Sequence, residues 1–160
     1  MEKIVLENSR LLLQLAYHYT GAVSDAEDIA QEAFVRLFTR AGKLNKQDSQ
    51  AVKAWLVRVT VNLSKDFLRS AWRRKRVTLR EQEGAAEPPE ETLLDTVRTL
   101  PPSYRAVIYL HYYEGYTLRE ISGLLDRPEK TIHTWHARAK KRLKETLERD
   151  DADVGKGRET

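Results

Sequence analysis

The sequence predicts an all-α protein composed of two small helical domains. Apolar residues recur at helical spacing over long stretches, which is the main sequence signal for helices. Glycine and proline, which interrupt helices, account for only 7 and 5 of the 160 residues. Charge is segregated into acidic and basic blocks, and one acidic stretch separates two helical regions. A chain of this length suits one ordinary domain or two small ones, and the acidic stretch favours two.

Two helices are predicted within the first 40 residues. The first runs from about Glu2 to Tyr19, and Gly21 is a natural residue to end it. The second starts at Ser24, whose hydroxyl can form a capping box with Glu27 three residues later. Its apolar residues follow the 3, 4 spacing of a buried stripe and are Ile29, Ala30, Ala33, Phe34, Leu37 and Phe38.

A loop over residues 40–50 precedes a long third helix, predicted from about Ala51 to Arg76. The apolar stripe of this helix contains Trp55, Leu56, Val59, Leu63, Phe67 and Leu68. Residues 81–91 are acidic and include Pro88 and Pro89, so they cannot bury enough apolar surface to fold alone. We therefore expect a flexible acidic linker after the first domain.

A second helical unit follows the linker. Its predicted helices cover residues 92–100, 103–115, 117–126 and 128–149. Gly115 ends the second of these, and Thr117 with Glu120 forms a capping box for the third. A short helix, a turn of three or four residues and a longer helix make a helix-turn-helix.

The predicted domain boundaries follow from these elements. The first domain covers residues 1–80, the linker 81–96, the second domain 97–149 and a disordered tail 150–160. In the second domain we expect Ile121, Leu124 and Leu125 to pack under the last helix. The side chains expected to face them are Ile132, Trp135 or His136, Ala139 and Leu143.

Charge and cysteine content restrict the possible functions. Residues 52–80 and 127–149 are basic and flank an acidic segment, which predicts two contacts with a polyanion. The chain has no cysteine, which excludes disulfides and thiolate metal sites and fits a reducing cytoplasm. Charged residues such as Glu2, Lys3 and Glu7 interrupt the apolar N-terminus, so we expect neither a signal peptide nor membrane insertion.

Three segments, taken in order, resemble the extracytoplasmic-function sigma factors of bacterial RNA polymerase. They are DAEDIAQEAFVRLF, AWLVRVTVNLSKDFLRSAWRRK and LPPSYRAVIYLHYYEGYTLREISGLLDRPEKTIHTWHARAKKRL. The resemblance covers about residues 12–147. It implies a region 2 domain that binds the clamp helices of the largest polymerase subunit and reads and melts the minus-ten element. It also implies a region 4 domain that binds the polymerase flap and reads the minus-thirty-five element.

The resemblance implies a polymerase contact on the second helix. The residues assigned to it are Asp25, Asp28, Gln31, Glu32, Arg36 and Leu37. Capping and the helix dipole alone also account for the acidic first turn, so an ordinary amphipathic helix is the alternative interpretation.

For the minus-ten element, the resemblance places a flipped base between Asn62 and the loop of residues 40–52. An amide side chain can both donate to and accept from a base edge. The further candidates for DNA contact on this helix are Lys65, Arg69, Trp72, Arg73 and Arg74. Basic side chains interleaved with an aromatic side chain suit binding to single-stranded DNA. A solvated basic end of the helix is the simpler alternative.

For the minus-thirty-five element, the outward face of the last helix is the predicted contact. The candidates on it are Lys130, Thr131, His133, Thr134, Arg138 and Lys141, and Thr117 at the start of the preceding helix is a further candidate. His136 stands where the family has a core leucine, and Trp135 stands where it has an arginine. Either residue could occupy the buried position, and we favour a position shared by both. His133 replaces the usual lysine, which predicts a weaker or pH-dependent contact.

His133 and His136 are three residues apart and could in principle ligate a metal, but a metal site needs three or four convergent ligands. We expect no metal, no cofactor and no enzymatic activity, since neither a catalytic pocket nor a phosphate-cradling glycine loop is evident. The expected partners are core RNA polymerase, promoter DNA and an anti-sigma factor, which can be membrane-linked. A helix-turn-helix repressor or activator that acts without being a polymerase subunit is the alternative function. The expected location is the cytoplasm, at the nucleoid when active.

Overall fold

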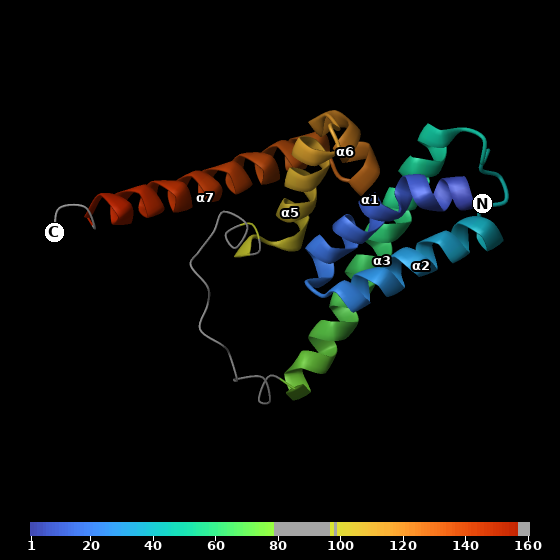
Figure 1. Ribbon diagram of the computed structural model, residues 1–160, viewed down its shortest axis with the longest axis horizontal. Coiled ribbons are helices and arrows are strands. Elements are labelled where there is room, and N and C mark those ends of the chain that lie inside the picture. The colour runs from blue at the N-terminus through green and yellow to red at the C-terminus, as the bar shows by residue number, and fades with distance from the viewer. Residues whose placement is uncertain (79–96, 98, 157–160) are drawn as a thin grey trace. The chain divides into compact units, whose positions relative to one another are not determined.

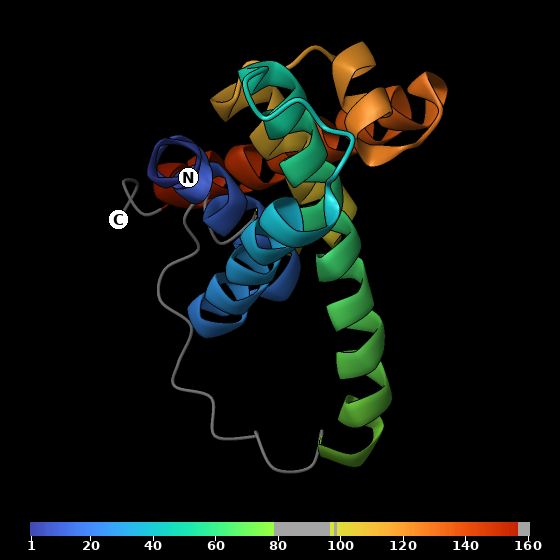
Figure 2. The ribbon, with the colours of Figure 1, turned by 90° about the vertical axis from the view of Figure 1, so that its right-hand side faces the viewer.

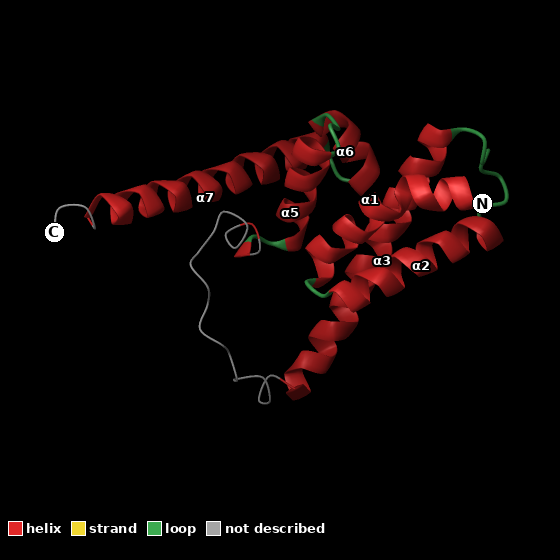
Figure 3. Cartoon of the chain, in the orientation of Figure 1, coloured by secondary structure: helices red, strands yellow, loops and turns green. Residues whose placement is uncertain are grey.

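The computed structural model describes residues 1–78, 97 and 99–156, and every regular element within these ranges is a helix (Figure 3). The predicted all-α class is therefore confirmed. The chain divides into two compact units, of which the first contains Met1–Gly84 and Gly123–Asp126 and the second contains Ala85–Ser122 and Arg127–Thr160. Each unit has its own packing. None of the described helices is both long enough and apolar enough to cross a membrane.

The first unit is a bundle of α1 (Glu2–Thr20), α2 (Val23–Arg40) and α3 (Ser49–Thr78), in which every pair of helices is in contact (Figure 1). Its main core cluster contains Leu12, Ala30, Ala33, Leu37, Ala41, Val52 and Leu56. A second cluster joins Ala16 of α1 to Ala26 and Ile29 of α2, where small side chains let the two backbones approach. The C-terminal turns of α3 extend beyond α1 and α2 (Figure 2).

The junction between α1 and α2 is tighter than predicted. Gly21 ends α1 with φ 74°, and its N–H donates to the carbonyl of Tyr17 at 2.9 Å, as expected for a glycine C-cap. Only Ala22, in an extended conformation, separates it from α2, which begins at Val23 without a side-chain cap. Ser24 therefore lies inside the first turn, and the predicted capping box of Ser24 with Glu27 is wrong.

The cap of α3 lies three residues before the predicted helix start. Asp48 Oδ1 accepts hydrogen bonds from the N–H groups of Gln50 at 3.2 Å and Ala51 at 3.1 Å. This carboxylate satisfies two of the donors that a helix N-terminus leaves without partners. The helix consequently begins at Ser49, and the segment Ala41–Asp48 forms the loop predicted over 40–50.

The second unit contains α5 (Pro102–Ile108), the π-helical turn η1 (Tyr109–Tyr113), the start of α6 (Leu118–Leu125) and α7 (Glu129–Lys156), while the end of α6 from Gly123 is grouped with the first unit. The sequence predicts one helix over 103–115, and the π-helical turn at its end is new. Gly115 ends this segment with φ 74°, as predicted. The predicted linker at 81–91 lies outside the described residues, as does most of the helix predicted over 92–100, of which Val97 and Thr99 are helical.

The helix-turn-helix forms as predicted at its N-terminal side. Thr117 Oγ1 accepts from the N–H of Glu120, and the Glu120 carboxylate accepts from the N–H of Thr117, both at 3.1 Å. Asp126 occupies the turn with φ 52°, and α7 follows. This helix continues to Lys156, so the predicted disorder from residue 150 is wrong for residues 150–156.

Most of the residues predicted to form the core around the last helix are buried, and the packing of α6 under α7 stays a prediction. Ile132 and Ala139 of α7 are fully buried, as is Ile121 of α6. Ala139 joins a cluster with Leu100 and Ile108, against which Tyr104 and Leu143 pack. The predicted core residues Leu124 and Leu125 are also buried.

The new cap gives a stability prediction. Replacing Asp48 with alanine leaves two N–H groups at the start of α3 without their acceptor. We expect D48A to lower the free energy of unfolding by about 1 kcal/mol in urea titrations. Asp48→Ser should retain most of the stability because serine also caps, and Gln47→Ala is the control because Gln47 contributes only its backbone N–H. A D48A variant as stable as the wild type would contradict the capping role.

Candidate functional site

The exposed side of α2 carries five of the six residues predicted to bind the polymerase. Asp28 and Gln31 are exposed, and Asp25, Glu32 and Arg36 are half-buried. Arg36 Nε donates to Glu32 Oε1 at 2.8 Å, so these two charges are paired along the helix.

Leu37 is not part of this surface. It is 0% exposed and belongs to the main core cluster of the first unit. The position follows the 3, 4 repeat of the buried apolar stripe, so its burial has a clear physical cause. The assignment of Leu37 to a polymerase contact is therefore corrected.

Asn62 lies on the outward side of α3. Its neighbour Val61 is 1% exposed and Ser64 is 0% exposed, whereas Asn62 itself is exposed. Lys65 is half-buried and has interaction partners, and Arg69 is exposed and paired with Asp66. Residues 62, 65 and 69 follow the spacing of one helical stripe, so the fold brings these three predicted DNA contacts to one side of α3.

Arg58 is a further member of this stripe. It is exposed and lies four residues before Asn62, which places it one turn earlier on the same side. The spacing of four from Asn62 was the available signal in the sequence. Trp72, Arg73 and Arg74 lie on the helical backbone of α3, but their side chains are outside the described part of the structure, so their DNA contacts stay predictions.

The loop between α2 and α3 lines a shallow pocket of about 660 Å³. The lining residues are Arg40, Ala41, Gly42, Lys43, Leu44 and Trp55. A half-buried indole beside two basic side chains can stack a base and hold its phosphate. Asn62 does not line this pocket, but it lies two helical turns after Trp55 on the same side of α3, roughly 10 Å along the axis.

In the second unit, the burial of Ile132 and Ala139 determines which side of α7 faces outward. Lys130, His133, Arg138 and Lys141 are exposed, and Thr131 and Thr134 are half-buried, with the Thr134 hydroxyl bonded to the Lys130 carbonyl at 3.0 Å. The imidazole of His133 lies 3.5 Å from the Glu129 carboxylate. Thr117 is exposed, but its hydroxyl is engaged in the capping box of α6.

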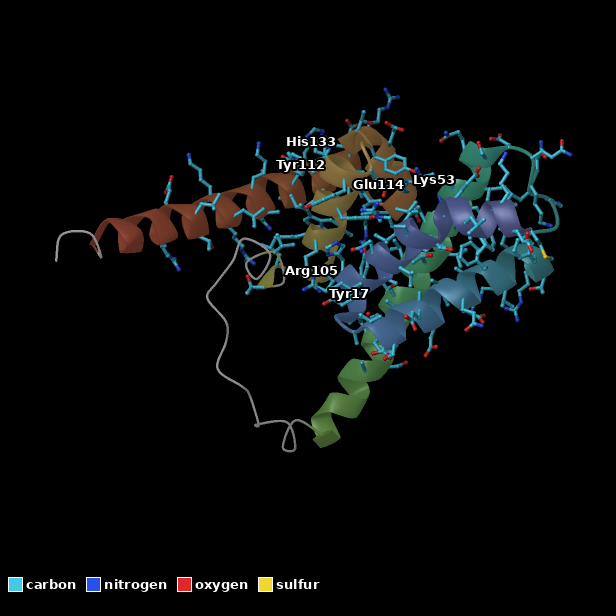
Figure 4. All side chains as sticks on the ribbon, in the orientation of Figure 1. Tyr17, Lys53, Arg105, Tyr112, Glu114 and His133 are labelled. Atoms are coloured by element: carbon cyan, nitrogen blue, oxygen red, sulfur yellow. The ribbon has the colours of Figure 1, made fainter. Side chains whose placement is uncertain are left out.

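Trp135 and His136 are both half-buried, which confirms the shared position predicted from the sequence. The Trp135 ring lies 6.2 Å from that of Tyr104, and the His136 ring lies edge-on to His111 at 5.1 Å. Tyr112 Oη is 3.2 Å from His136 Nε2 (Figure 4, where the labels Tyr112 and His133 mark η1 and the start of α7). Among the described ranges, no three His, Asp or Glu side chains converge as metal ligands.

Two family models match the chain in the order expected from the two units. Residues 4–74 match the model described as Sigma-70 region 2, and residues 90–143 match that described as Sigma-70, region 4. Similar curated proteins include the ECF RNA polymerase sigma factor SigE of Mycolicibacterium smegmatis, 27% identical over 96% of this chain. Another is the ECF RNA polymerase sigma factor BldN of Streptomyces coelicolor, 32% identical over 85% of this chain.

The chain belongs to the extracytoplasmic-function sigma factors. It spans 63% of the length of SigE and 55% of the length of BldN. The sigma factor RpoE of Bartonella quintana, solved in complex with the anti-sigma factor NepR, matches with a TM-score of 0.67 at 19% identity. That match covers 92% of this chain and 96% of RpoE, and it supports the fold.

His136 lies among the rings of His111 and Tyr112, and its surroundings indicate a pH effect. Burial lowers the pKa of His136 below its ordinary value of 6.5, and the positive charges that His111, Lys140 and His133 can carry lower it further. The folded state therefore binds a proton at this site less readily than the unfolded state does. The contribution of neutral His136 to the free energy of unfolding is fully present above pH 6.5. It is lost as the pH falls through the folded-state pKa.

We expect the second unit to lose stability as the pH is lowered below 6.5, measured by hydrogen exchange of α7 in the full chain. His136→Gln should reduce this loss because glutamine does not titrate and its amide can still form a hydrogen bond with the Tyr112 hydroxyl. His133→Gln, an exposed position on the same helix, is the control and should retain most of the loss. Parallel pH profiles for H136Q and the wild type would exclude His136 as the cause.

Proposed function

We propose that this chain is a sigma subunit that directs core RNA polymerase to specific promoters and nucleates strand opening. The observation that carries this proposal is the presence of both sigma regions in one chain, each with an outward stripe of basic and polar side chains. We assign region 2 to residues 1–80 and region 4 to residues 97–149. The role is regulatory rather than enzymatic, since the energy for opening would come from binding.

Region 2 would hold the clamp helices through the exposed side of α2. The mixed acidic and basic residues there, including the Glu32–Arg36 pair, suit a helix laid against partner helices. On α3, Asn62 would capture a base flipped from the non-template strand. Binding of this base must offset an unstacking cost of a few kcal/mol. The loop pocket beside Trp55 offers a second surface for the same strand.

Region 4 would read the minus-thirty-five element through α7. Its outward stripe would enter the major groove, with Lys130, Thr134 and Lys141 at the centre and Arg138 at one edge. Thr117 lies at the start of α6, where the helix N-terminus can hold a phosphate. The polymerase flap is the second partner proposed for this unit.

An anti-sigma factor is a proposed regulatory partner. RpoE of Bartonella quintana was solved with the anti-sigma factor NepR, and its fold resembles this chain. We propose that the chain acts in the cytoplasm and joins the nucleoid when bound to polymerase. A helix-turn-helix regulator that acts alone is disfavoured because it would leave the region 2 unit without a role.

The direct test is run-off transcription with purified core polymerase from the source organism. Adding the chain should produce transcripts from a cognate promoter, and core polymerase alone should produce none. Tight DNA binding without transcripts would instead indicate a repressor.

Asn62→Ala should reduce promoter opening more than polymerase binding, because the amide would contact DNA only after a base has flipped. Opening can be measured by permanganate reactivity of thymines, and polymerase binding by competition for core enzyme. Gln14→Ala, which removes an exposed amide from α1, is the control. Equal losses of both activities in N62A would count against a base pocket at Asn62.

Arg138→Ala should weaken binding of the holoenzyme to promoter duplex and lower the salt slope by about one phosphate contact, or roughly 0.9. Arg10→Ala, an exposed arginine on α1, provides a control of equal charge change. An unchanged slope would remove Arg138 from the phosphate contacts.

A further inference from the structure

One edge of α7 and the turn before it carry arginines whose side chains lie close to aromatic side chains. Positions 135, 138 and 142 share one helical stripe, which adjoins the outward stripe of positions 130, 134 and 141. The guanidinium carbon of Arg127 lies 6.0 Å from the centre of the Trp135 ring, and that of Arg142 lies 5.8 Å from the Tyr104 ring. Arg138 Nη1 lies 3.5 Å from the Tyr104 hydroxyl.

The two rings are fixed by the core of the second unit. Tyr104 is half-buried on α5 and packs against Leu100, Ile108 and Ala139, where α5 contacts α7 (Figure 1). Its ring lies against that of Trp135, with 6.2 Å between centroids and a tilt of 37°. The core therefore holds Tyr104 directly and Trp135 through Tyr104, and the pair gives the arginines beside it an aromatic surface to lie against.

The charges on this edge are available to a partner. Arg127, Arg138 and Arg142 are exposed, and no carboxylate in the described ranges forms an ion pair with any of them. Arg36 and Arg69 differ in this respect, because Glu32 and Asp66 pair with them. A guanidinium lying on a ring keeps its edge free to donate to phosphate oxygens while its face stays on the aromatic.

We propose that Tyr104 and Trp135 hold Arg127, Arg138 and Arg142 as a phosphate-binding edge that grips the DNA backbone beside the groove entered by α7. The partner is the sugar-phosphate backbone of promoter duplex, and the proposal rests on the function proposed above for region 4. Preorganised arginines lose less side-chain entropy on binding than free ones. Phosphate contacts carry no sequence information, so this edge sets affinity and register while the central stripe sets specificity.

The first test is the double variant Arg127→Gln with Arg142→Gln in the holoenzyme, bound to promoter duplex over a range of salt concentrations. Two lost contacts should lower the salt slope by roughly 1.8 and the affinity at 0.15 M salt by about 10- to 30-fold. The preference for the cognate minus-thirty-five element over an altered one should not change. Lys3→Gln with Arg10→Gln, an equal charge change on α1, is the control.

A slope equal to that of the control variant would overturn the proposal, as would a selective loss of affinity for the cognate element. An unchanged slope combined with weaker core binding would assign the edge to a protein partner instead and would also overturn it. The proposed function fails separately, because wild-type holoenzyme would then start no transcripts at any salt concentration.

The second test separates positioning from charge. Arg127→Lys with Arg142→Lys keeps both charges but loses the stacked planar group, so we expect a slope close to wild type with a several-fold lower affinity. Trp135→Leu should abolish the difference between arginine and lysine at position 127, since the ring that favours arginine is gone. Equal affinities of the lysine variant and the wild type would show that the rings do not position the arginines.

Discussion

A helix that buries one stripe of side chains presents the opposite stripe to solvent, and both units depend on this constraint. In the second unit, burial of Ile132 and Ala139 sets the rotation of α7 about its axis. In the first unit, the burial of Leu56 and Val61 does the same for α3. The side chains available to a nucleic acid are therefore determined by the core and do not require a preformed cleft. This arrangement suits a protein whose work is binding rather than chemistry.

The exposed surfaces of α2 and α7 differ in whether their arginines are paired with carboxylates. On α2 the arginine at position 36 is neutralised along its own helix by Glu32. On and just before α7, Arg127 and Arg142 lie against aromatic rings, and no carboxylate in the described ranges pairs with them. A paired surface suits a protein partner, where unpaired charges would be costly to bury. An unpaired basic surface suits a polyanion, and its affinity should depend strongly on salt.

Local features of the fold were largely predictable from the sequence. Gly21, Gly115 and the capping box of Thr117 with Glu120 depend on residues at most three or four apart, and all three were confirmed. The predicted capping box at Ser24 does not form, because the turn after α1 is short and α2 begins one residue before Ser24. The π-helical turn could not be predicted. Its bond from the Glu114 N–H to the Tyr109 carbonyl differs from an ordinary α-helical bond by one residue in spacing, and no local sequence pattern specifies that difference.

The candidate site was partly predictable for similar reasons. Helical spacing predicted the buried stripe that contains Leu37, and only the family resemblance assigned that residue to a polymerase contact. The outward position of Lys141 is as predicted, and the spacing of four could have placed Arg58 beside Asn62. The aromatic support beneath the edge of α7 was not predictable, because Tyr104 and Trp135 are far apart in the sequence. Contacts of this kind depend on how α5 crosses α7, which no local pattern specifies.

In the proposed polymerase complex, α7 turns one defined face to promoter DNA. The chain contains no cysteine, so single cysteines placed along α7 provide unique thiols. The most direct measurement is the alkylation rate of each thiol in holoenzyme with and without promoter duplex. We expect strong protection at positions 130, 137 and 141 and little at position 140, which is exposed but faces another side. Equal protection at positions 140 and 141, or none at either, would contradict this expectation.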